Sequence, residues 1–289
     1  GEGGLVVVDL ERPEAPRLQA RLDLGDIRRV AVEGDLACVS DSQGNLTLID
    51  MSDPSAPSVL SSIPGADAGY LEIRNGYVFV SSISGGLSVY DARNPREPRF
   101  FESSGLGDLG SLAFKTDYLY AGTPSGIMVI QTYLVGESYV VSGWSTTGRS
   151  HGVSLYGEEL SVADHEGGAR LYKLNGESTQ SIKFPFVRDV AISDGLLALA
   201  DDVAGIELFT RSDTDDPWVE SDMNTPTPRA SDVSISSTQV VGVSPETGLY
   251  LWKRTPEGFL TEAMEIPFLG ARESASGLGI LAVADESEI

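Results

Sequence analysis

The residues best suited to chemistry in this sequence are its two histidines, His151 and His165, with the acidic residues beside them. His165 stands between Asp164 and Glu166 in the run A-D-H-E-G-G. Imidazole nitrogens and carboxylate oxygens are ligands that zinc accepts, so these four residues are candidate metal ligands. Their spacing matches no strong metal motif, and a solvated acidic loop is the simpler interpretation. We therefore expect no cofactor, with a bound metal ion as the less favoured alternative.

Other signals of catalysis are weak. The run Asp213-Thr-Asp215-Asp216 has the D-x-D start of a calcium loop, but it lacks the following glycine and the distal Glu, and Pro217 interrupts it. The sequence contains no G-x-S-x-G elbow, no glycine-rich phosphate loop leading into a helix and no C-x-x-C pair. Serines are plentiful, but nothing singles out a nucleophile. The sequence therefore predicts no catalytic residue.

The elements that would position a site come from an internal repeat. Each copy has a short apolar strand, a second strand after a turn, and a third strand. The residue that opens the third strand is Leu5, Leu46, Leu87, Ile127, Ala169, Ile206 or Leu249. The gaps between these positions are 41, 41, 40, 42, 37 and 43 residues, and the gap from the last round to the first is 45. Short apolar runs bounded by Gly, Asn, Asp and Pro, repeated at this period, are typical of propeller blades.

The two ends of the chain read as halves of one further copy. The run G-I-L-A-V-A-D-E at residues 279–286 and the run G-G-L-V-V-V-D-L at residues 3–10 form one unit when they are joined. We therefore predict an all-β fold, a seven-bladed β-propeller of four-stranded blades that fills residues 1–289 as a single domain. Its ring would be closed by a blade that residues 272–289 and 3–22 share.

In a propeller, the connections into the innermost strands share one face with the loops between second and third strands, and ligands bind there at the channel mouth. The residues that we expect to bind a ligand are Arg29, Tyr70, His151, Arg188, Asp189, Asp232, Arg272 and Glu273. Their charges either pair across a wet channel or form a binding mouth, because buried charges need partners. The adjacent loops add acidic residues such as Asp201 and Asp202. Asp recurs there in four copies, which favours a turn role.

Composition limits the class of partner. The net charge is −23 and the pI is about 4.3, which argues against nucleic acid and against direct binding to anionic membranes. Solubility is the favoured reason for this charge; adaptation to high salt and attraction of basic partners are the alternatives. The single cysteine, Cys38, is expected to pack as a small hydrophobe. No signal peptide or membrane-spanning run is found, and the chain starts inside a strand, so we expect a mature form or an excised domain.

Three copies carry a tighter signature after the third strand: an Asp followed by Pro at the fourth and seventh positions. They read D-L-E-R-P-E-A-P from Asp9, D-M-S-D-P-S-A-P from Asp50 and D-A-R-N-P-R-E-P from Asp91. Proline is tolerated at the entry of an outermost strand, whose N–H groups lack partners. With L-V-V-V-D and L-T-L-I-D before two of them, these copies resemble the LVIVD-repeat family of β-propellers. The middle copies depart from the pattern, since Gln131, Lys173, Thr210 and Lys253 replace the Asp.

The resemblance implies a propeller repeat protein in an extracellular, periplasmic or cell-surface setting, and it brings no catalytic residues. We therefore expect a non-enzymatic interaction or scaffold module of an exported or cell-surface bacterial protein. It would bind a partner protein or a polar ligand at the face that bears the channel mouth. The alternative is an enzyme or small-ligand-binding propeller with a polar site at the same mouth, either with or without a bound cation.

Overall fold

The structure, a computed structural model, contains 28 β-strands and no helix among the residues that it describes. It describes all residues except 1–2, 11, 13–14, 83, 133–138, 225, 256–259, 262, 268–269, 278–279 and 286–289, and for 139, 276–277, 280 and 285 it describes the backbone alone. In this described part, no helix is long and apolar enough to cross a membrane.

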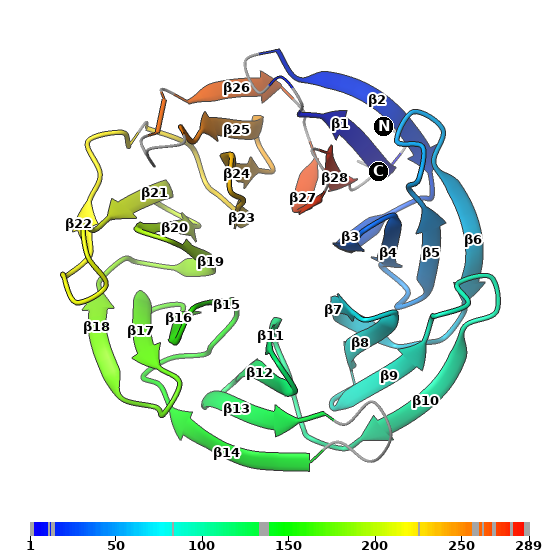
Figure 1. The fold of residues 1–289 in the computed structure, drawn as a ribbon, viewed down its shortest axis with the longest axis horizontal. Coiled ribbons are helices and arrows are strands. Elements are labelled where there is room, and N and C mark those ends of the chain that lie inside the picture. Colours follow the sequence, from blue (N-terminus) through cyan, green and yellow to red (C-terminus); the bar gives the residue numbers. More distant parts are fainter. Residues whose placement is uncertain are drawn as a thin grey trace. The chain divides into compact units, whose positions relative to one another are not determined.

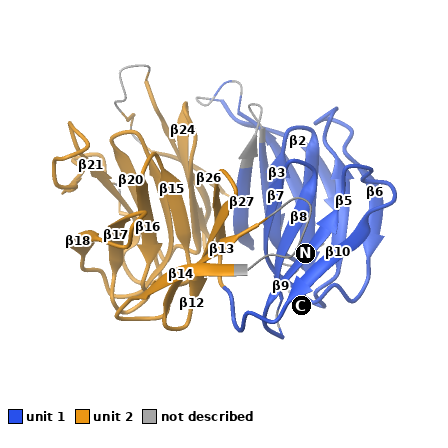
Figure 2. Ribbon diagram, turned by 60° about the horizontal axis from the view of Figure 1, so that its bottom comes forward, with its two compact units in different colours: residues 1–109, 270–289 blue, residues 110–269 orange. Residues whose placement is uncertain are grey.

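The strands form seven four-stranded antiparallel sheets, which are the predicted propeller blades (Figure 1). Six sheets use four strands that follow one another in the sequence, and the seventh has the order β2-β1-β28-β27. The predicted fold class, an all-β propeller with seven blades, is confirmed. The chain divides into two compact units, residues 1–109 with 270–289 and residues 110–269, coloured separately in Figure 2. The expectation of a single domain stays a prediction.

Unit 1 holds three blades. The strands of each blade are named from first to fourth. The blade that both chain ends share contains β27 (Ala271–Gly277), β28 (Ile280–Asp285), β1 (Gly4–Asp9) and β2 (Arg17–Asp23). The next blade contains β3 (Ile27–Glu33), β4 (Leu36–Asp41), β5 (Leu46–Asp50) and β6 (Ser58–Ile63), and the third contains β7 (Ala68–Arg74), β8 (Tyr77–Ser82), β9 (Leu87–Asp91) and β10 (Arg99–Ser104).

Unit 2 holds four blades. The first contains β11 (Leu112–Lys115), β12 (Tyr118–Thr123), β13 (Gly126–Gln131) and β14 (Tyr139–Ser145), and the second contains β15 (Val153–Tyr156), β16 (Glu159–Ala163), β17 (Ala169–Lys173) and β18 (Ser178–Ile182). The third contains β19 (Val187–Ser193), β20 (Leu196–Asp201), β21 (Gly205–Thr210) and β22 (Val219–Glu220). The fourth contains β23 (Asp232–Ile235), β24 (Gln239–Ser244), β25 (Gly248–Lys253) and β26 (Met264–Pro267).

The chain ends pair with each other inside unit 1, as the sequence predicts. Strand β1 runs antiparallel to β28, with Leu5 opposite Ala284 and Val8 opposite Leu281, and β27 completes the blade on the far side of β28 (Figure 1). Residues 279 and 286, which bound the predicted C-terminal run, lie outside the described part. Two segments at opposite ends of the sequence therefore depend on each other for their backbone hydrogen bonds.

The hydrophobic core lies between the sheets and explains the repeat. The seven residues that the sequence places at the start of the third strands are the first or second residues of those strands, and all are buried, none more than 4% exposed. In unit 1, Leu5 and Val7 pack with Ile27 and Val30 of the next blade, so neighbouring blades bury apolar faces that neither could bury alone. Cys38 is fully buried, and burial raises the pKa of its thiol to about 12, so it packs as an inert small hydrophobe.

One blade of unit 2 departs from the common plan in its outermost strand. Strand β22 has two residues, and side chains replace the missing ladder along β21. The amide of Ile206 donates to Oγ1 of Thr227 at 2.6 Å, and the amide of Leu208 donates to Oδ1 of Asn224 at 2.7 Å. These bonds satisfy the exposed edge of β21 and fix the segment that leads towards Arg229 and β23.

Candidate functional site

Three of the predicted ligand-binding residues come together in unit 1. Arg29 lies at the start of β3, and its Nη1 donates to Oε2 of Glu273 on β27 at 2.6 Å. Its guanidinium also lies 4.0 Å from the centroid of the Tyr70 ring on β7. Oε1 of Glu273 accepts the amide of Val30 at 3.2 Å. We call Glu273, Arg29 and Tyr70 the unit 1 cluster.

The unit 1 cluster joins three blades. The Glu273 carboxylate meets the Arg29 guanidinium, and the Tyr70 ring covers that guanidinium. The Arg29 and Glu273 side chains are 31% and 16% exposed. The second carboxylate oxygen of Glu273 accepts a hydrogen bond from a backbone amide of the next blade. Pairing of opposite charges, the first of the two interpretations drawn from the sequence, holds for these residues. Arg272, the neighbouring residue on β27, is half-buried.

Asp189 in unit 2 has the same bond to the next blade. Its Oδ2 accepts the amide of Val233 on β23 at 3.2 Å, as Glu273 accepts the amide of Val30. A Cβ atom at Gly152 would clash with Oδ1 of Asp189, so the glycine leaves room for this carboxylate. Asp232, half-buried, opens β23 beside Val233. Asp189 therefore holds neighbouring first strands together.

Asp164, a candidate metal ligand, is fully buried in the turn between β16 and β17. Its Oδ2 accepts hydrogen bonds from the amide and hydroxyl of Thr147 at 3.0 and 2.7 Å and from Nε of Arg170 at 3.0 Å. Its Oδ1 accepts the amide of Gly148 at 3.0 Å. Both carboxylate oxygens therefore hold the preceding loop against this turn, which is the turn role that recurrence of Asp predicts.

The two histidines lie beside each other, as their shared blade predicts. Their ring centroids are 5.2 Å apart, and the His165 ring lies 5.3 Å from that of Phe186, edge to face. His165 has a positive φ of 48° and forms an isolated bridge with Val187, which precedes Arg188. Glu166 is exposed. Among the described residues, no three His, Cys, Asp or Glu side chains gather as metal ligands. The expectation of no cofactor, with a bound metal ion as the less favoured alternative, stays a prediction.

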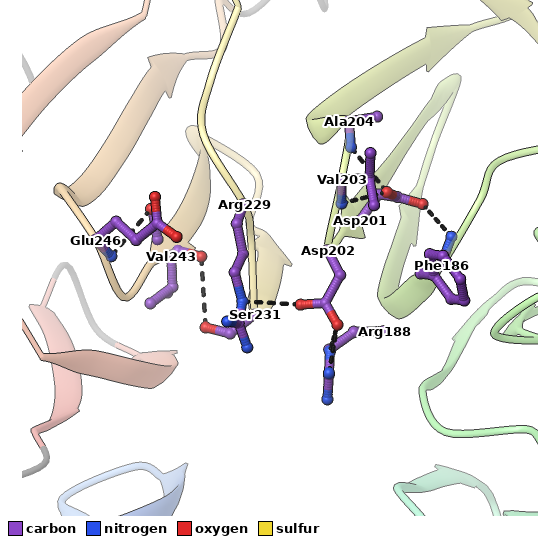
Figure 3. Close-up of polar contacts among 11 residues, drawn as sticks. Phe186, Arg188, Asp201, Asp202, Val203, Ala204, Arg229, Ser231, Val243 and Glu246 are labelled. Atoms are coloured by element: carbon purple, nitrogen blue, oxygen red, sulfur yellow. Dashed lines mark hydrogen bonds and ion pairs between the residues drawn. The ribbon is translucent and has the colours of Figure 1, made fainter.

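Arg188 belongs to a second arginine–carboxylate cluster, drawn in Figure 3, with a different charge balance. Its guanidinium contacts Oδ2 of Asp202 through Nε and Nη2. Nε of Arg229 donates to Oδ1 of the same carboxylate at 3.0 Å. The arginine side chains are 43% and 45% exposed, and Asp202 is 17% exposed. We call Arg188, Asp202 and Arg229 the unit 2 cluster; it combines two positive charges with one negative charge.

The turn that carries Asp202 is fixed by the neighbouring Asp201 (Figure 3). This carboxylate is fully buried and accepts the amides of Phe186 at 2.8 Å, Val203 at 2.7 Å and Ala204 at 2.8 Å. The amide of Asp202 also donates to the carbonyl oxygen of Phe186 at 3.0 Å. Phe186 and Asp202 are therefore held in one short, hydrogen-bonded frame.

Sequence reasoning did not select Phe186 or Arg229, and it placed Asp202 on the candidate face without selecting it as a ligand-binding residue. The two consecutive Asp residues at positions 201 and 202 could have indicated a site. The recurrent turn needs only one carboxylate, so the second Asp is free for another role. Arg229 gives a weaker signal, because it lies in the connection into β23, three residues before the strand begins. No feature of the sequence marks Phe186 as exposed.

Comparison with known proteins supports the repeat and the fold. Residues 24–63 match the family model of the LVIVD repeat. The chain contains an LVIVD repeat. The predicted resemblance to LVIVD-repeat propellers is thereby confirmed, with its match at β3–β6, one of the blades that carry the sequence signature. No curated protein matches the chain in sequence.

Solved structures are similar in fold alone. The computationally designed Ika8 protein is 10% identical, with a TM-score of 0.62 over 90% of this chain and 94% of its own. Saccharomyces cerevisiae Sqt1 is 9% identical, with a TM-score of 0.62 over 91% of this chain and 97% of its own. At these identities the likeness supports a propeller architecture and carries no residue roles.

Proposed function

We propose that this protein is a non-enzymatic interaction module that binds a partner protein through the unit 2 cluster and the rings beside it. The observation that carries this proposal is the unequal charge of the cluster: two half-exposed guanidiniums share a single carboxylate. A guanidinium has five N–H donors, so the pair keeps donors that Asp202 does not use. A carboxylate side chain of a partner would complete the cluster.

The surroundings of the cluster favour a protein partner. Phe186 is 36% exposed and packs against His165, which in turn packs against His151. Aromatic residues and arginine are the residue types that contribute most to protein interfaces. The hydrogen bonds of Asp201 hold this loop in place before binding, which lowers the entropy cost of association. The expected epitope is therefore an acidic side chain next to an apolar one.

The net charge of −23 opposes an acidic partner at long range. At physiological salt the Debye length is about 8 Å, so salt screens this long-range repulsion more strongly than it screens direct contacts at the cluster. The carboxylates of the exposed Glu166 and Glu246 would repel an acidic partner unless its acidic group faces the arginines. An extracellular, periplasmic or cell-surface setting, which the family resemblance implies, belongs to the same proposal.

A titration with an acidic peptide tests the proposal. The probe is a fluorescein-labelled peptide with Glu on either side of Leu, and the same peptide with Gln is its control. We expect the double variant Arg188→Gln/Arg229→Gln to bind the Glu peptide at least about tenfold more weakly, since one charge-assisted hydrogen bond contributes about 1.5–3 kcal/mol. The matched control is Arg93→Gln, because Arg93 is exposed and paired one to one with Asp91. Equal affinity of the wild type for the Glu and Gln peptides would overturn the proposal.

A further inference from the structure

A second surface of unit 2 lies at the opposite end of the same strands. Strand β19 begins next to Arg188 and ends at Ser193, and the turn from Ser193 to Gly195 opens into a groove of about 1400 Å³. Small-molecule pockets usually measure about 300–1,000 Å³, so the groove is large enough for a peptide segment. It also borders the turns β15–β16 and β23–β24, and these three blades are neighbours in Figure 1.

Part of the groove lining is apolar and open to solvent. Tyr156 is 44% exposed and Val219 is 60% exposed. Met223 and Leu260 are half-buried and complete this lining. Large apolar side chains gathered in one exposed groove are a feature of surfaces that bind another molecule.

The rim of the groove is acidic. Asp194, Asp216 and Asp222 line it, and all three are exposed. Within the residues that the structure describes, none of these side chains forms an ion pair. Asp213 and Asp215, both exposed, extend the negative charge along the connection between β21 and β22. In the sequence this run has only the start of a calcium loop, and the fold places it beside the apolar lining of the groove.

The two arginines that line the groove are already engaged. Arg211 donates to Oε1 and Oε2 of Glu159 at 3.2 and 2.5 Å and lies 4.1 Å from the centroid of the buried Trp218 ring. Arg254 donates to Oγ of Ser193 at 3.0 Å and to the carbonyl oxygen of Asp194. These contacts hold both guanidiniums against the walls of the groove. Arg211 is neutralised by Glu159, so Arg254 is the one arginine of the lining whose charge remains against the three carboxylates of the rim. The groove therefore carries a net negative charge.

We propose that this groove binds a basic, partly apolar peptide segment of a partner protein, with Lys or Arg side chains at the rim and an aliphatic side chain on Tyr156 and Val219. Charge complementarity selects this occupant: a second copy of the chain would bring a further charge of −23 to an acidic rim. Since this site and the unit 2 cluster lie at opposite ends of the blades, the module would hold two partners of opposite charge.

The test uses a fluorescein-labelled peptide of alternating Lys and Leu and the whole protein. The variant Asp194→Asn/Asp216→Asn/Asp222→Asn should bind it at least about tenfold more weakly than the wild type, and Val219→Ser about threefold more weakly. The matched control is Asp23→Asn/Asp35→Asn/Asp108→Asn in unit 1, which removes the same charge from exposed positions. The control should change the affinity less than about twofold.

Several outcomes would overturn the inference. Equal loss in both triple variants would mean that the peptide responds to the general charge of the protein. Equal affinity for a peptide of alternating Glu and Leu would exclude charge selection. Sedimentation that shows dimers of the wild type, but not of the Asp194 triple variant, would assign the groove to a second copy.

The Arg188→Gln/Arg229→Gln variant should bind the Lys peptide like the wild type, so that the two sites are tested separately.

Discussion

The unit 1 cluster and the unit 2 cluster use the same residue types to different ends. Both have an arginine at the start of the first strand of a blade, and both have a carboxylate that receives it. In unit 1 the carboxylate also accepts a backbone amide and the arginine is covered by a tyrosine ring. In unit 2 one carboxylate serves two arginines that are each more exposed. Charge balance and exposure, rather than residue type, separate a structural cluster from one that is available to a partner.

The largest effect should come from removing the most fully engaged carboxylate. Asp164→Ala leaves Arg170 and the amides of Thr147 and Gly148 without their buried acceptor, so we expect a loss of about 3–5 kcal/mol in the free energy of unfolding. Urea denaturation measures it. The neighbouring exposed residue gives the control, since Glu166→Ala should cost less than about 0.5 kcal/mol. Similar losses in the two variants would refute the structural role of Asp164.

The next effect compares the two clusters directly. Glu273→Ala removes an ion pair and the acceptor of the Val30 amide, and we expect a loss of about 2–3 kcal/mol in the free energy of unfolding. Asp202→Ala should cost less than about 1 kcal/mol, because its arginine partners stay hydrated. The comparison fails if Asp202→Ala destabilises the protein as much as Glu273→Ala, as judged by the same denaturation curves.

How much of this arrangement the sequence predicts depends on whether a feature recurs. The third-strand residues such as Leu46 recur because every blade must bury that position, and they fix the blade number, the strand order and the shared terminal blade. The turn role of Asp164 follows from recurrence as well. The unit 2 cluster occurs once, and it depends on the distance between Asp202 and Arg229, which lie on different blades. No periodic pattern encodes that distance, so the structure was needed to find it.

Two half-buried carboxyl groups, one in each unit, should make stability depend on pH. Burial raises the pKa of Glu72 on β7 to about 8 and that of Glu207 on β21 to about 7, from an ordinary value of 4.5. Because the folded state binds these protons more tightly, their contribution to stability is present below pH 4.5 and is lost as the pH rises through 7 to 8. Denaturation at pH 5 to 9 measures the slope.

Glu72→Gln should flatten this dependence more than Glu207→Gln, since Glu72 has the larger shift. Nearby Glu33 adds to the shift of Glu72, and Arg74 opposes it. The control is Glu246→Gln, an exposed residue, which should leave the slope as it is in the wild type. An unchanged slope in Glu72→Gln would show that the side chain is ionised in the folded protein at neutral pH.

The smallest effect on stability should come from the arginines assigned to binding. Arg188→Gln and Arg229→Gln should each change the free energy of unfolding by less than about 0.5–1 kcal/mol, because exposed ion pairs contribute little. Arg29→Gln should cost more, since it leaves Glu273 unpaired and removes the contact with Tyr70. A larger loss in Arg188→Gln than in Arg29→Gln would reverse the roles of the two clusters.

The most direct test of the account observes both clusters in one experiment. The Nε–Hε signals of the arginines in ¹⁵N-labelled protein can be followed by NMR while the acidic Glu-Leu-Glu peptide is added. The account predicts saturable shifts for Arg188 and Arg229 and none for Arg29, which lies between Glu273 and the Tyr70 ring, or for Arg93, which pairs with Asp91. Shifts of Arg29 as large as those of Arg188, or no shift of Arg188 and Arg229 at saturating peptide, would contradict it.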